Sequence, residues 1–431
     1  MHTLRTRLTL LAALATLALL AENANAQRPF ALKDGETIVF VGDSITQGGD
    51  YIGMVEDYLV TRFPDQKFRV INTGLSSETV SGTTEPDHDP PRPCLHDRFD
   101  RDVAPLKPDV MIACYGMNDG NYHPFSEERF LKYQAGVRRL IDRAEELGAR
   151  LIILTPPPYD PYRRKLSDAE VVHYGYKFPA VDYDDVLERY GHWLIGLRGE
   201  GYTVGDVGTT MRDHLARQRA KKVSYTLARD GVHPQATGHW LMAQALLQAL
   251  NAPGRSGECS INAKSLTADK GEVSGLKKLD GGGVAFSWMC PIPMGIDPRV
   301  EAEAVQLEEV HDRFNKTLLR VRGLAEGKYD VLVDGKRALR TDAMALGRGV
   351  NLTTTKDFPP MKRAAEVYQL ISKRRKKISG DWRKSRGIDD PSGAASVDAL
   401  EKAEQETASQ LEEARSLAQP LKIDVEVVPA K

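Results

Sequence analysis

Three residues far apart in the sequence have the side chains that nucleophilic attack on a carbonyl group requires. Ser44 offers a hydroxyl nucleophile, His233 a base that can take its proton, and Asp230 a carboxylate that can orient the base. The backbone N–H groups of Ser44 and Gly74 and the side-chain amide of Asn118 can donate hydrogen bonds to an oxyanion. Together these residue types predict acyl transfer, provided that the fold brings them to one place.

Four short polar segments carry these residues, and the first three follow apolar runs. The segments are Gly42-Asp43-Ser44, Asn72-Thr73-Gly74, Gly116-Met117-Asn118-Asp119 and Asp230-Gly231-Val232-His233. The apolar runs Ile38–Val41, Phe68–Asn72 and Asp109–Tyr115 predict buried parallel strands. Open α/β sheets bind ligands at the carboxyl ends of such strands, so we expect the segments to converge on one edge. A single short string of this kind arises by chance, whereas all four in this order are a specific signal.

Structural roles compete with catalytic ones at several of these positions. Ser44 could instead be a helix N-cap, and His233 a structural histidine. We expect Asp43 to stabilise its turn rather than act as a second catalytic carboxylate, and Asp119 to hold its own loop. The other histidines are scattered without a His-Glu-x-x-His pair, so the sequence predicts no metal site and no cofactor.

Strands and helices are predicted to alternate from Gln27 to Pro253. Ser126 and Gly148 have the residue types that begin and end a long amphipathic helix, which a strand at Arg150–Thr155 follows. Further elements are expected at residues 184–197 (helix), 203–207 (strand) and 235–250 (helix). Repeated strand–helix units predict an α/β domain with a parallel sheet and helices on both faces.

The four segments resemble the four sequence blocks of the SGNH/GDSL hydrolase superfamily. Gly-Asp-Ser-Ile-Thr, Asn-Thr-Gly, Gly-Met-Asn-Asp and Asp-Gly-Val-His-Pro occur in the family's order within residues 36–250. The resemblance implies a flavodoxin-like α/β/α sandwich in which Ser44 is the nucleophile, His233 the base and Asp230 its partner. It also implies an oxyanion hole formed by Ser44, Gly74 and Asn118.

The second block departs from the family pattern at one point. Many members carry a second glycine shortly after the one that corresponds to Gly74, where this chain has Ser76-Ser77. We expect this difference to alter the shape of the pocket rather than the catalysis. Since the resemblance ends before Gly254, it predicts a hydrolase domain over residues 27–253 and says nothing about the remainder.

The first 26 residues predict a signal peptide. Arg5 and Arg7 precede the apolar run Leu8–Leu20, and Ala24-Asn25-Ala26 has the form of a signal-peptidase site. We therefore expect a mature chain from Gln27 that is secreted or periplasmic, with an uncleaved anchor helix as the alternative. No second apolar run is long enough to cross a membrane, so no stable membrane insertion is expected after cleavage.

Residues 254–431 predict a β-rich accessory region with packed helices. Strands are expected at Val284–Met289, Leu318–Arg322, Tyr329–Val333 and 421–427, and helices at Met361–Lys377 and Val397–Ala418. The first helix has a basic end, Lys373–Lys377, and the second is acidic, so the two could pair as a helical hairpin. Residues 385–396 are the expected flexible link.

Net charge and cysteine content bear on possible partners and on disulfide formation. The 431 residues have a formal net charge of −1, which gives no reason to expect nucleic acid or an anionic membrane surface as a partner. The four cysteines leave disulfides possible in an exported protein, with Cys259 and Cys290 as a possible pair.

The function expected is that of a secreted serine esterase, which forms an acyl-enzyme on Ser44 and acts on O-acetyl groups of carbohydrate. Export and the lack of a long apolar lid favour a polar ester, and the loops Glu85–Arg98 and Tyr159–Pro179 could form a sugar-facing cleft. A lipase or thioesterase of the same family, with an apolar acyl tunnel, is one alternative. A non-catalytic carbohydrate- or surface-binding protein is another. The sequence leaves the oligomeric state open.

Overall fold

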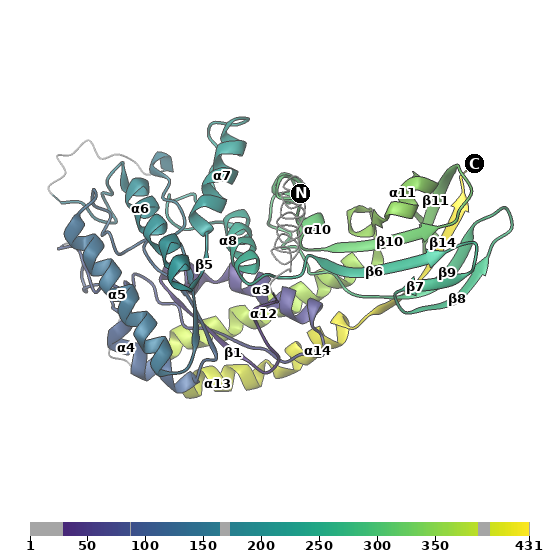
Figure 1. Cartoon of the computed structure of the whole chain (residues 1–431). Helices are drawn as coiled ribbons and strands as arrows, with labels where there is room; N and C mark the ends of the chain where they lie inside the picture. Colours follow the sequence, from purple (N-terminus) through teal and green to yellow (C-terminus); the bar gives the residue numbers. More distant parts are fainter. Residues whose placement is uncertain (1–28, 87, 164–172, 387–396, 431) are drawn as a thin grey trace, which may run out of the picture.

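The chain folds into an α/β body that is joined to a β-sandwich (Figure 1). The computed structural model describes residues 29–86, 88–163, 173–386 and 397–430. The predicted signal peptide and most of the expected link at 385–396 lie outside these residues. Although helix α12 has 28 residues, neither it nor any other described helix is apolar over a stretch long enough to cross a bilayer.

Five parallel strands form the sheet of the α/β body, in the order β2-β1-β3-β4-β5. They are β1 (Thr37–Gly42), β2 (Arg69–Asn72), β3 (Val110–Cys114), β4 (Arg150–Leu154) and β5 (Thr203–Gly205). Val39 of β1 pairs with Ile71 on one side and with Met111 on the other, so the three strands end at the same level. All residues of β3 are buried, as expected for a strand covered on both faces. The predicted α/β fold with a parallel sheet is confirmed.

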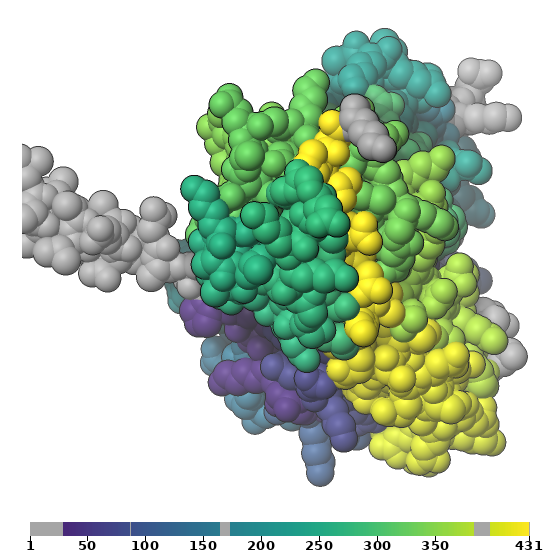
Figure 2. All heavy atoms as spheres, turned by 90° about the vertical axis from the view of Figure 1, so that its right-hand side faces the viewer, coloured from purple at the N-terminus to yellow at the C-terminus, as the bar shows by residue number. Residues whose placement is uncertain are grey.

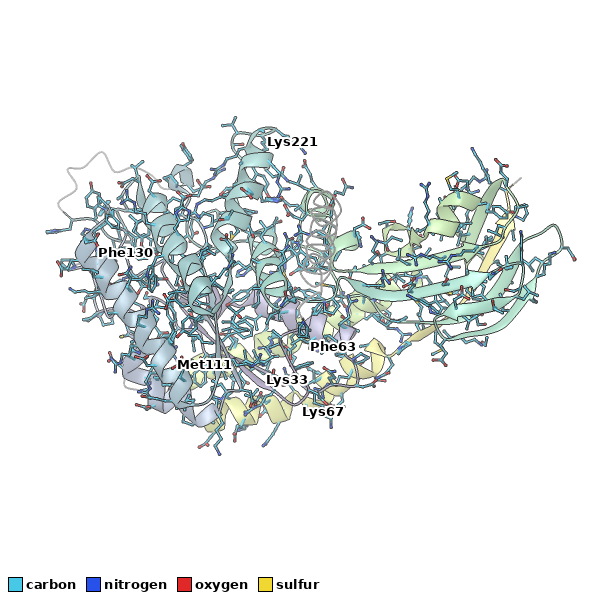
Figure 3. All side chains as sticks on the ribbon, in the orientation of Figure 1. Lys33, Phe63, Lys67, Met111, Phe130 and Lys221 are labelled. Atoms are coloured by element: carbon cyan, nitrogen blue, oxygen red, sulfur yellow. The ribbon has the colours of Figure 1, made fainter. Side chains whose placement is uncertain are left out.

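Helices pack on this sheet in two layers (Figure 1). They are α2 (Ser44–Gly48), α3 (Asp50–Arg62), α4 (Leu95–Asp102), α5 (Glu127–Glu146), α6 (Tyr183–Gly196), α7 (Val207–Arg219) and α8 (Ala236–Ala249). Phe130 of α5, labelled in Figure 3, stacks on Tyr190 of α6 with ring centroids 5.2 Å apart. Helix α8 packs between α3 and α7. Ser126 caps α5, its side chain accepting the N–H of Arg129 at 3.4 Å. The sequence predicted neither α4 nor α7.

Two sheets make up the β-sandwich, in the orders β13-β10-β6-β7 and β12-β11-β14-β9-β8. The strands are β6 (Arg255–Asn262), β7 (Thr267–Lys270), β8 (Val273–Lys278), β9 (Val284–Cys290), β10 (Lys316–Arg322), β11 (Lys328–Val333), β12 (Lys336–Asp342), β13 (Val350–Asn351) and β14 (Leu421–Pro429). Side chains such as Leu319, Trp288 and Val425 fill the core between the sheets. Cys259 and Cys290 are both buried in this core as free thiols, so the possible disulfide is not formed.

Three short helices lie between strands of the sandwich in the sequence: α9 (Ala302–Leu307), α10 (Val310–Arg313) and α11 (Ala343–Arg348). Ala304 of α9 and Val310 of α10 belong to the buried cluster of the α/β body. Three further helices of the predicted accessory region then lie against the α/β body. These are α12 (Pro359–Arg386), α13 (Val397–Glu406) and α14 (Ala408–Ala418), and α12 packs along α3, α13 and α14. Figure 2 shows α13 and α14, in yellow, below the sandwich and continuous with β14, which crosses it. Ile378, Trp382 and Leu400 belong to the same buried cluster as the parallel strands. Part of the region after residue 253 therefore completes the core of the α/β body.

The basic end of α12 has two sets of partners. Lys377 forms an ion pair with Glu406 of α13 at 2.7 Å, as the helical-hairpin hypothesis requires. Arg374 and Arg375 instead pair with the buried carboxylate of Glu56 in α3. The basic run thus joins α12 to the α/β body as well as to the acidic helices.

Candidate active site

Ser44 is the first residue of α2 and follows β1 directly, so it lies at the carboxyl edge of the sheet. The helix begins there because the carboxylate of Asp43 accepts the backbone N–H of Ile45 at 2.9 Å. Asp43 therefore stabilises its turn, as predicted. Burial raises the pKa of Asp43 to about 7, although the hydrogen bond from Ile45 opposes the shift.

Ser44, His233 and Asp230 form a continuous chain of polar contacts. Oγ of Ser44 lies 2.8 Å from Nε2 of His233, and Nδ1 of that ring lies 2.6 Å from Oδ2 of Asp230. Oδ1 of Asp230 also accepts the backbone N–H groups of His233 at 2.8 Å and Val232 at 3.0 Å. Partial burial alone would raise the pKa of Asp230, but these hydrogen bonds outweigh it and hold the pKa below its usual value. An ionised carboxylate is thus fixed against the imidazole.

His233 is held by the loop that precedes α8. Gln235 is the N-cap of that helix, so Pro234 lies just before the helix rather than in its first turn. The side chains of His233 and Asp230 are 40% and 42% exposed. The chain of contacts is therefore open to a substrate from solvent.

The predicted oxyanion-hole donors lie in the expected loops, but they differ in whether each already has a hydrogen-bond acceptor within the protein. The N–H of Ser44 belongs to the first turn of α2, where no intrahelical acceptor is available. A Cβ at position 74 would lie 2.4 Å from the backbone nitrogen of Gln47, so only glycine lets this loop touch α2. The N–H of Gly74 already donates to Oδ1 of Asn72 at 2.9 Å, so a substrate would have to share it.

Asn118 is oriented by two neighbours. Its Nδ2 donates to the carbonyl oxygen of Glu78 at 3.1 Å, and its Oδ1 accepts the hydroxyl of Tyr122 at 3.0 Å. Because an amide nitrogen carries two hydrogens, one remains for another acceptor. Sequence reasoning gave no role to Tyr122.

A buried ion pair that was not predicted from the sequence supports these loops. Arg98 donates to both carboxylate oxygens of Glu78 at 2.5 and 2.7 Å, and Tyr115 donates to the same carboxylate at 2.6 Å. Arg98 also donates to the carbonyl oxygen of Thr73 at 2.8 Å. The only sign of this ion pair in the sequence is the presence of charged residues between the second and third blocks, because no fixed spacing marks such a contact.

Asp119 holds loops together rather than facing Ser44. Its Oδ1 accepts the backbone N–H groups of Val80 and Ser81, both at 2.9 Å. Burial raises the pKa of Asp119 to about 6, against the effect of hydrogen bonds from Ser81, Val80 and Gly116. Within the described residues, no group of three or more His, Cys, Asp or Glu side chains could hold a metal ion.

The two loops expected to form a cleft do border one hollow of about 390 Å³. Its lining residues are Glu85, His88, Asp89, His173, Tyr174, Gly175, Tyr176, Lys177 and Phe178. Glu85 is fixed by Arg92, which donates to both carboxylate oxygens at 2.5 Å. Residues 164–172 of the second loop lie outside the described part of the chain.

Comparisons with known proteins were consistent in fold and family. Residues 40–241 match the model of the GDSL-like lipase/acylhydrolase family. An acetylxylan esterase from Geobacillus stearothermophilus is 26% identical over 244 residues, which cover 50% of this chain and 94% of that protein. A solved structure of a catalytic mutant of an acetylxylan esterase from the same organism is 23% identical, with a TM-score of 0.39, over 52% of this chain and 97% of that one.

A third relative matches the whole architecture. The structure of a gut microbial diltiazem-metabolizing enzyme has a TM-score of 0.73 and 21% identity, and the match covers 94% of this chain and 100% of that one. The α/β body and the β-sandwich therefore recur together in another protein.

Proposed function

This chain belongs to the SGNH/GDSL hydrolase superfamily and is a carboxylic ester hydrolase, and we propose that it acts through Ser44, His233 and Asp230. The observation that carries the proposal is the unbroken chain of contacts from Ser44 Oγ through His233 to Asp230, at 2.8 and 2.6 Å. A serine that served only as a helix cap would need no such partner. In this structure the cap is Asp43.

In the proposed reaction Oγ of Ser44 attacks the ester carbonyl carbon while its proton passes to Nε2 of His233. Asp230 stabilises the imidazolium. The N–H groups of Ser44 and Gly74 and the side-chain amide of Asn118 donate to the oxyanion. The imidazolium then protonates the leaving alkoxide, which departs as an alcohol. Water, deprotonated by His233, cleaves the acyl-enzyme and restores Ser44.

The substrate proposed is an O-acetyl group on carbohydrate. Support comes from the acetylxylan esterase relative and from the hollow between the loops 85–98 and 159–179, where Tyr174, Tyr176 and Phe178 lie beside polar groups. Apolar rings with a few fixed polar groups suit sugar rings and their hydroxyls.

Secretion is a further proposal, and it is supported only by the first 26 residues of the sequence. It predicts that the chain isolated from its native host begins at Gln27, which N-terminal sequencing would reveal. Isolation of a chain that retains residues 1–26 in the membrane fraction would favour the anchor alternative.

Acetate release from acetylated polysaccharides and from a soluble aryl acetate tests the activity. Ser44→Ala and His233→Ala should each lower kcat by about 10⁶-fold, as in other hydrolases whose residues act as a unit. Near-normal rates in both variants would refute the assignment. If only the aryl ester is cleaved, and the cleavage depends on Ser44, the esterase activity is retained and the proposed carbohydrate substrate is rejected. If wild type is inactive and a fluorophosphonate probe leaves Ser44 unlabelled, the binding-protein alternative is preferred.

A further inference from the structure

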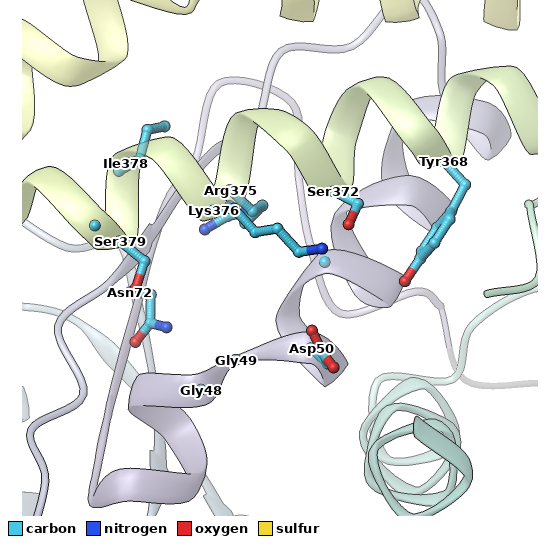
Figure 4. Close-up of a pocket in the computed structure, with 12 residues that line it drawn as sticks. Gly48, Gly49, Asp50, Asn72, Tyr368, Ser372, Arg375, Lys376, Ile378 and Ser379 are labelled. Carbon is cyan, nitrogen blue, oxygen red and sulfur yellow. The ribbon is translucent and has the colours of Figure 1, made fainter. Parts of the chain in front are cut away.

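A second cavity, of about 270 Å³, lies where α12 crosses the junction of α2 and α3 (Figure 4). Its lining residues are Gly48, Gly49, Asp50, Gly53, Asn72, Tyr368, Ser372, Arg375, Lys376, Ile378, Ser379 and Gly380. An adjoining hollow of about 420 Å³ shares Tyr368, Ser372 and Lys376 with it. The two together form a groove along α12, which we call the α12 groove.

Close packing and a positive φ explain Gly49 in this lining, but close packing does not explain the other three glycines. Gly48, Gly53 and Gly380 are all helical, and a Cβ built on any of them has no atom within 4 Å. Glycine destabilises a helix relative to alanine, and here no close contact requires it. A side chain at any of these three positions would therefore extend into open space beside the cavity.

The charge of the α12 groove is positive. Asp50 is paired with Arg299 at 2.9 Å, and Arg375 is paired with Glu56. Lys376 and Lys373 are exposed, and neither has an ion-pair partner among the described residues. Figure 4 shows Lys376 extended from α12 over the cavity, toward Asp50 and Tyr368. Two cations thus remain available for an anionic ligand.

The α12 groove is adjacent to the candidate active site. Ser379 donates to the carbonyl oxygen of Gln47 at 3.5 Å, and Gln47 belongs to the five-residue helix that begins with Ser44. Asn72 lines the cavity with the same side chain that accepts the N–H of Gly74. An occupant of the cavity would therefore contact the loop that carries a predicted oxyanion donor.

We propose that the α12 groove is a substrate subsite for a sugar unit that bears a carboxylate. Lys376 and Lys373 would bind the carboxylate, while Ser372, Ser379 and Asn72 offer hydrogen bonds to sugar hydroxyls. The inference rests on the proposed esterase function and narrows its substrate to acetylated acidic polysaccharide. It also gives α12 a part in substrate selection.

A matched pair of substrates tests the subsite: an acetylated oligosaccharide that contains uronic acid, and the same oligosaccharide after reduction of its carboxyl groups to alcohols. Wild type should show a kcat/KM about tenfold or more higher on the acidic form, the size expected for one charge-assisted hydrogen bond. Lys376→Gln should bring this ratio close to one. Lys362→Gln, on the same helix but paired with Asp357 away from the groove, should keep the wild-type ratio. Equal rates of wild type on both forms would overturn the proposal.

Filling the cavity gives a second test that does not depend on charge. Gly380→Leu should raise KM for the acidic oligosaccharide by about tenfold, since the new side chain occupies the hollow. Gly347→Leu in α11 is the matched control, because position 347 is also open but lies away from the groove. An unchanged KM in Gly380→Leu would count against the subsite.

Binding separates failure of the subsite from failure of the esterase. Ser44→Ala should bind the acidic oligosaccharide by calorimetry and lose affinity when Lys376→Gln is added. If wild type binds the acidic oligosaccharide but does not hydrolyse it, the proposed esterase function is rejected and the groove remains a carbohydrate-binding site. Hydrolysis of the aryl acetate without any binding preference for the acidic sugar would retain the esterase function and reject the subsite.

Discussion

Asn72 accepts the backbone N–H of Gly74 on its Oδ1 at 2.9 Å and donates from Nδ2 to the carbonyl oxygen of Thr46 at 2.7 Å. One side chain therefore joins the loop after β2 to the helix that begins with Ser44. The position of the Gly74 N–H relative to Ser44 depends on this link. Asn72 thus acts as a positioning residue, although its own side chain takes no part in the proposed reaction.

Replacing Asn72 by alanine should lower kcat by about tenfold while KM for a small aryl acetate changes little, because two hydrogen bonds that place the loop are lost. Asn72→Asp keeps an acceptor for the Gly74 N–H and should retain more activity than the alanine variant. Steady-state kinetics on both variants would check this. A full wild-type kcat in Asn72→Ala would show that the loop is held by other contacts.

Tyr122 should affect activity through Asn118. Asn118→Ala should lower kcat by about 10²–10³-fold if its amide donates to the oxyanion. Tyr122→Phe removes only the hydroxyl that holds Oδ1 of Asn118, so its loss should be smaller and should vanish when Asn118 is already alanine. The double-mutant cycle measures this directly, and additive losses would contradict the coupling.

Ser77, the second residue of the Ser76-Ser77 pair, adopts a left-handed backbone conformation with φ of 64°. That conformation costs a non-glycine residue about 1 kcal/mol. Ser77→Gly should therefore raise the free energy of unfolding by about 0.5 kcal/mol after the entropy of the unfolded glycine is deducted. Ser76→Gly, a neighbour without positive φ, should lower it. Chemical denaturation of both variants compares them, and a loss of stability in Ser77→Gly would contradict the argument.

Asp43 should make stability depend on pH. Its pKa is about 7 in the folded chain, against 3.8 as the ordinary value, so between about pH 4 and 7 the folded state binds more protons than the unfolded state. The contribution of Asp43 to the free energy of unfolding therefore falls as pH rises from about 4 to 7, and it is constant above that range.

Asp43→Asn keeps an oxygen acceptor for the N–H of Ile45 and removes the titration. The gain in unfolding free energy of the variant over wild type should grow by about 1 kcal/mol per pH unit from pH 4 to 7 and then level off. Urea denaturation at four pH values would measure it. A gain that does not change with pH would mean that Asp43 is ionised throughout.

Glu56 should matter far more for stability than a surface carboxylate. It is 4% exposed and lies 3.0 Å from Arg374, so Glu56→Gln leaves buried guanidinium charge unpaired and should cost about 3 kcal/mol or more. Glu200→Gln removes the partner of Arg138 at an exposed pair, where solvent screens the charges, so it should change stability little. Thermal unfolding of the two variants makes the comparison, and similar losses would show that α12 docks without this pair.

The sequence could predict the parallel strands from local patterns, and the meeting of Ser44, His233 and Asp230 from their residue types and the resemblance to the SGNH/GDSL superfamily. An apolar run such as Ile38–Val41 has few alternatives to a strand buried on both faces. The polar segments that follow such strands must then lie at one edge of the sheet. Ser44 lies at that edge, and the loop before α8 brings His233 into contact with it across 189 residues.

Elements that depend on distant partners escaped prediction. Helix α4 is rich in charged residues and follows a proline-rich loop. The charge of its buried Arg98 is paired with that of Glu78 in another loop. The first turn of helix α7, from Val207 to Thr210, consists of weak helix formers, which the cap at Asp206 compensates. Strand β7 is exposed along its whole length, so it has no apolar alternation to detect. Local patterns cannot report such contacts.

The place of β14 has a consequence for how the chain is made in the cell. This strand lies between β11 and β9, although β9 ends at Cys290 and β14 begins only at Leu421, about 130 residues later. At about 10 residues per second, ribosomes need on the order of 10 s to add that stretch. For that time β9 and β11 each present an open edge to other nascent chains. Protection by chaperones should therefore be needed chiefly by the sandwich, and least by the sheet whose strands are complete by residue 205.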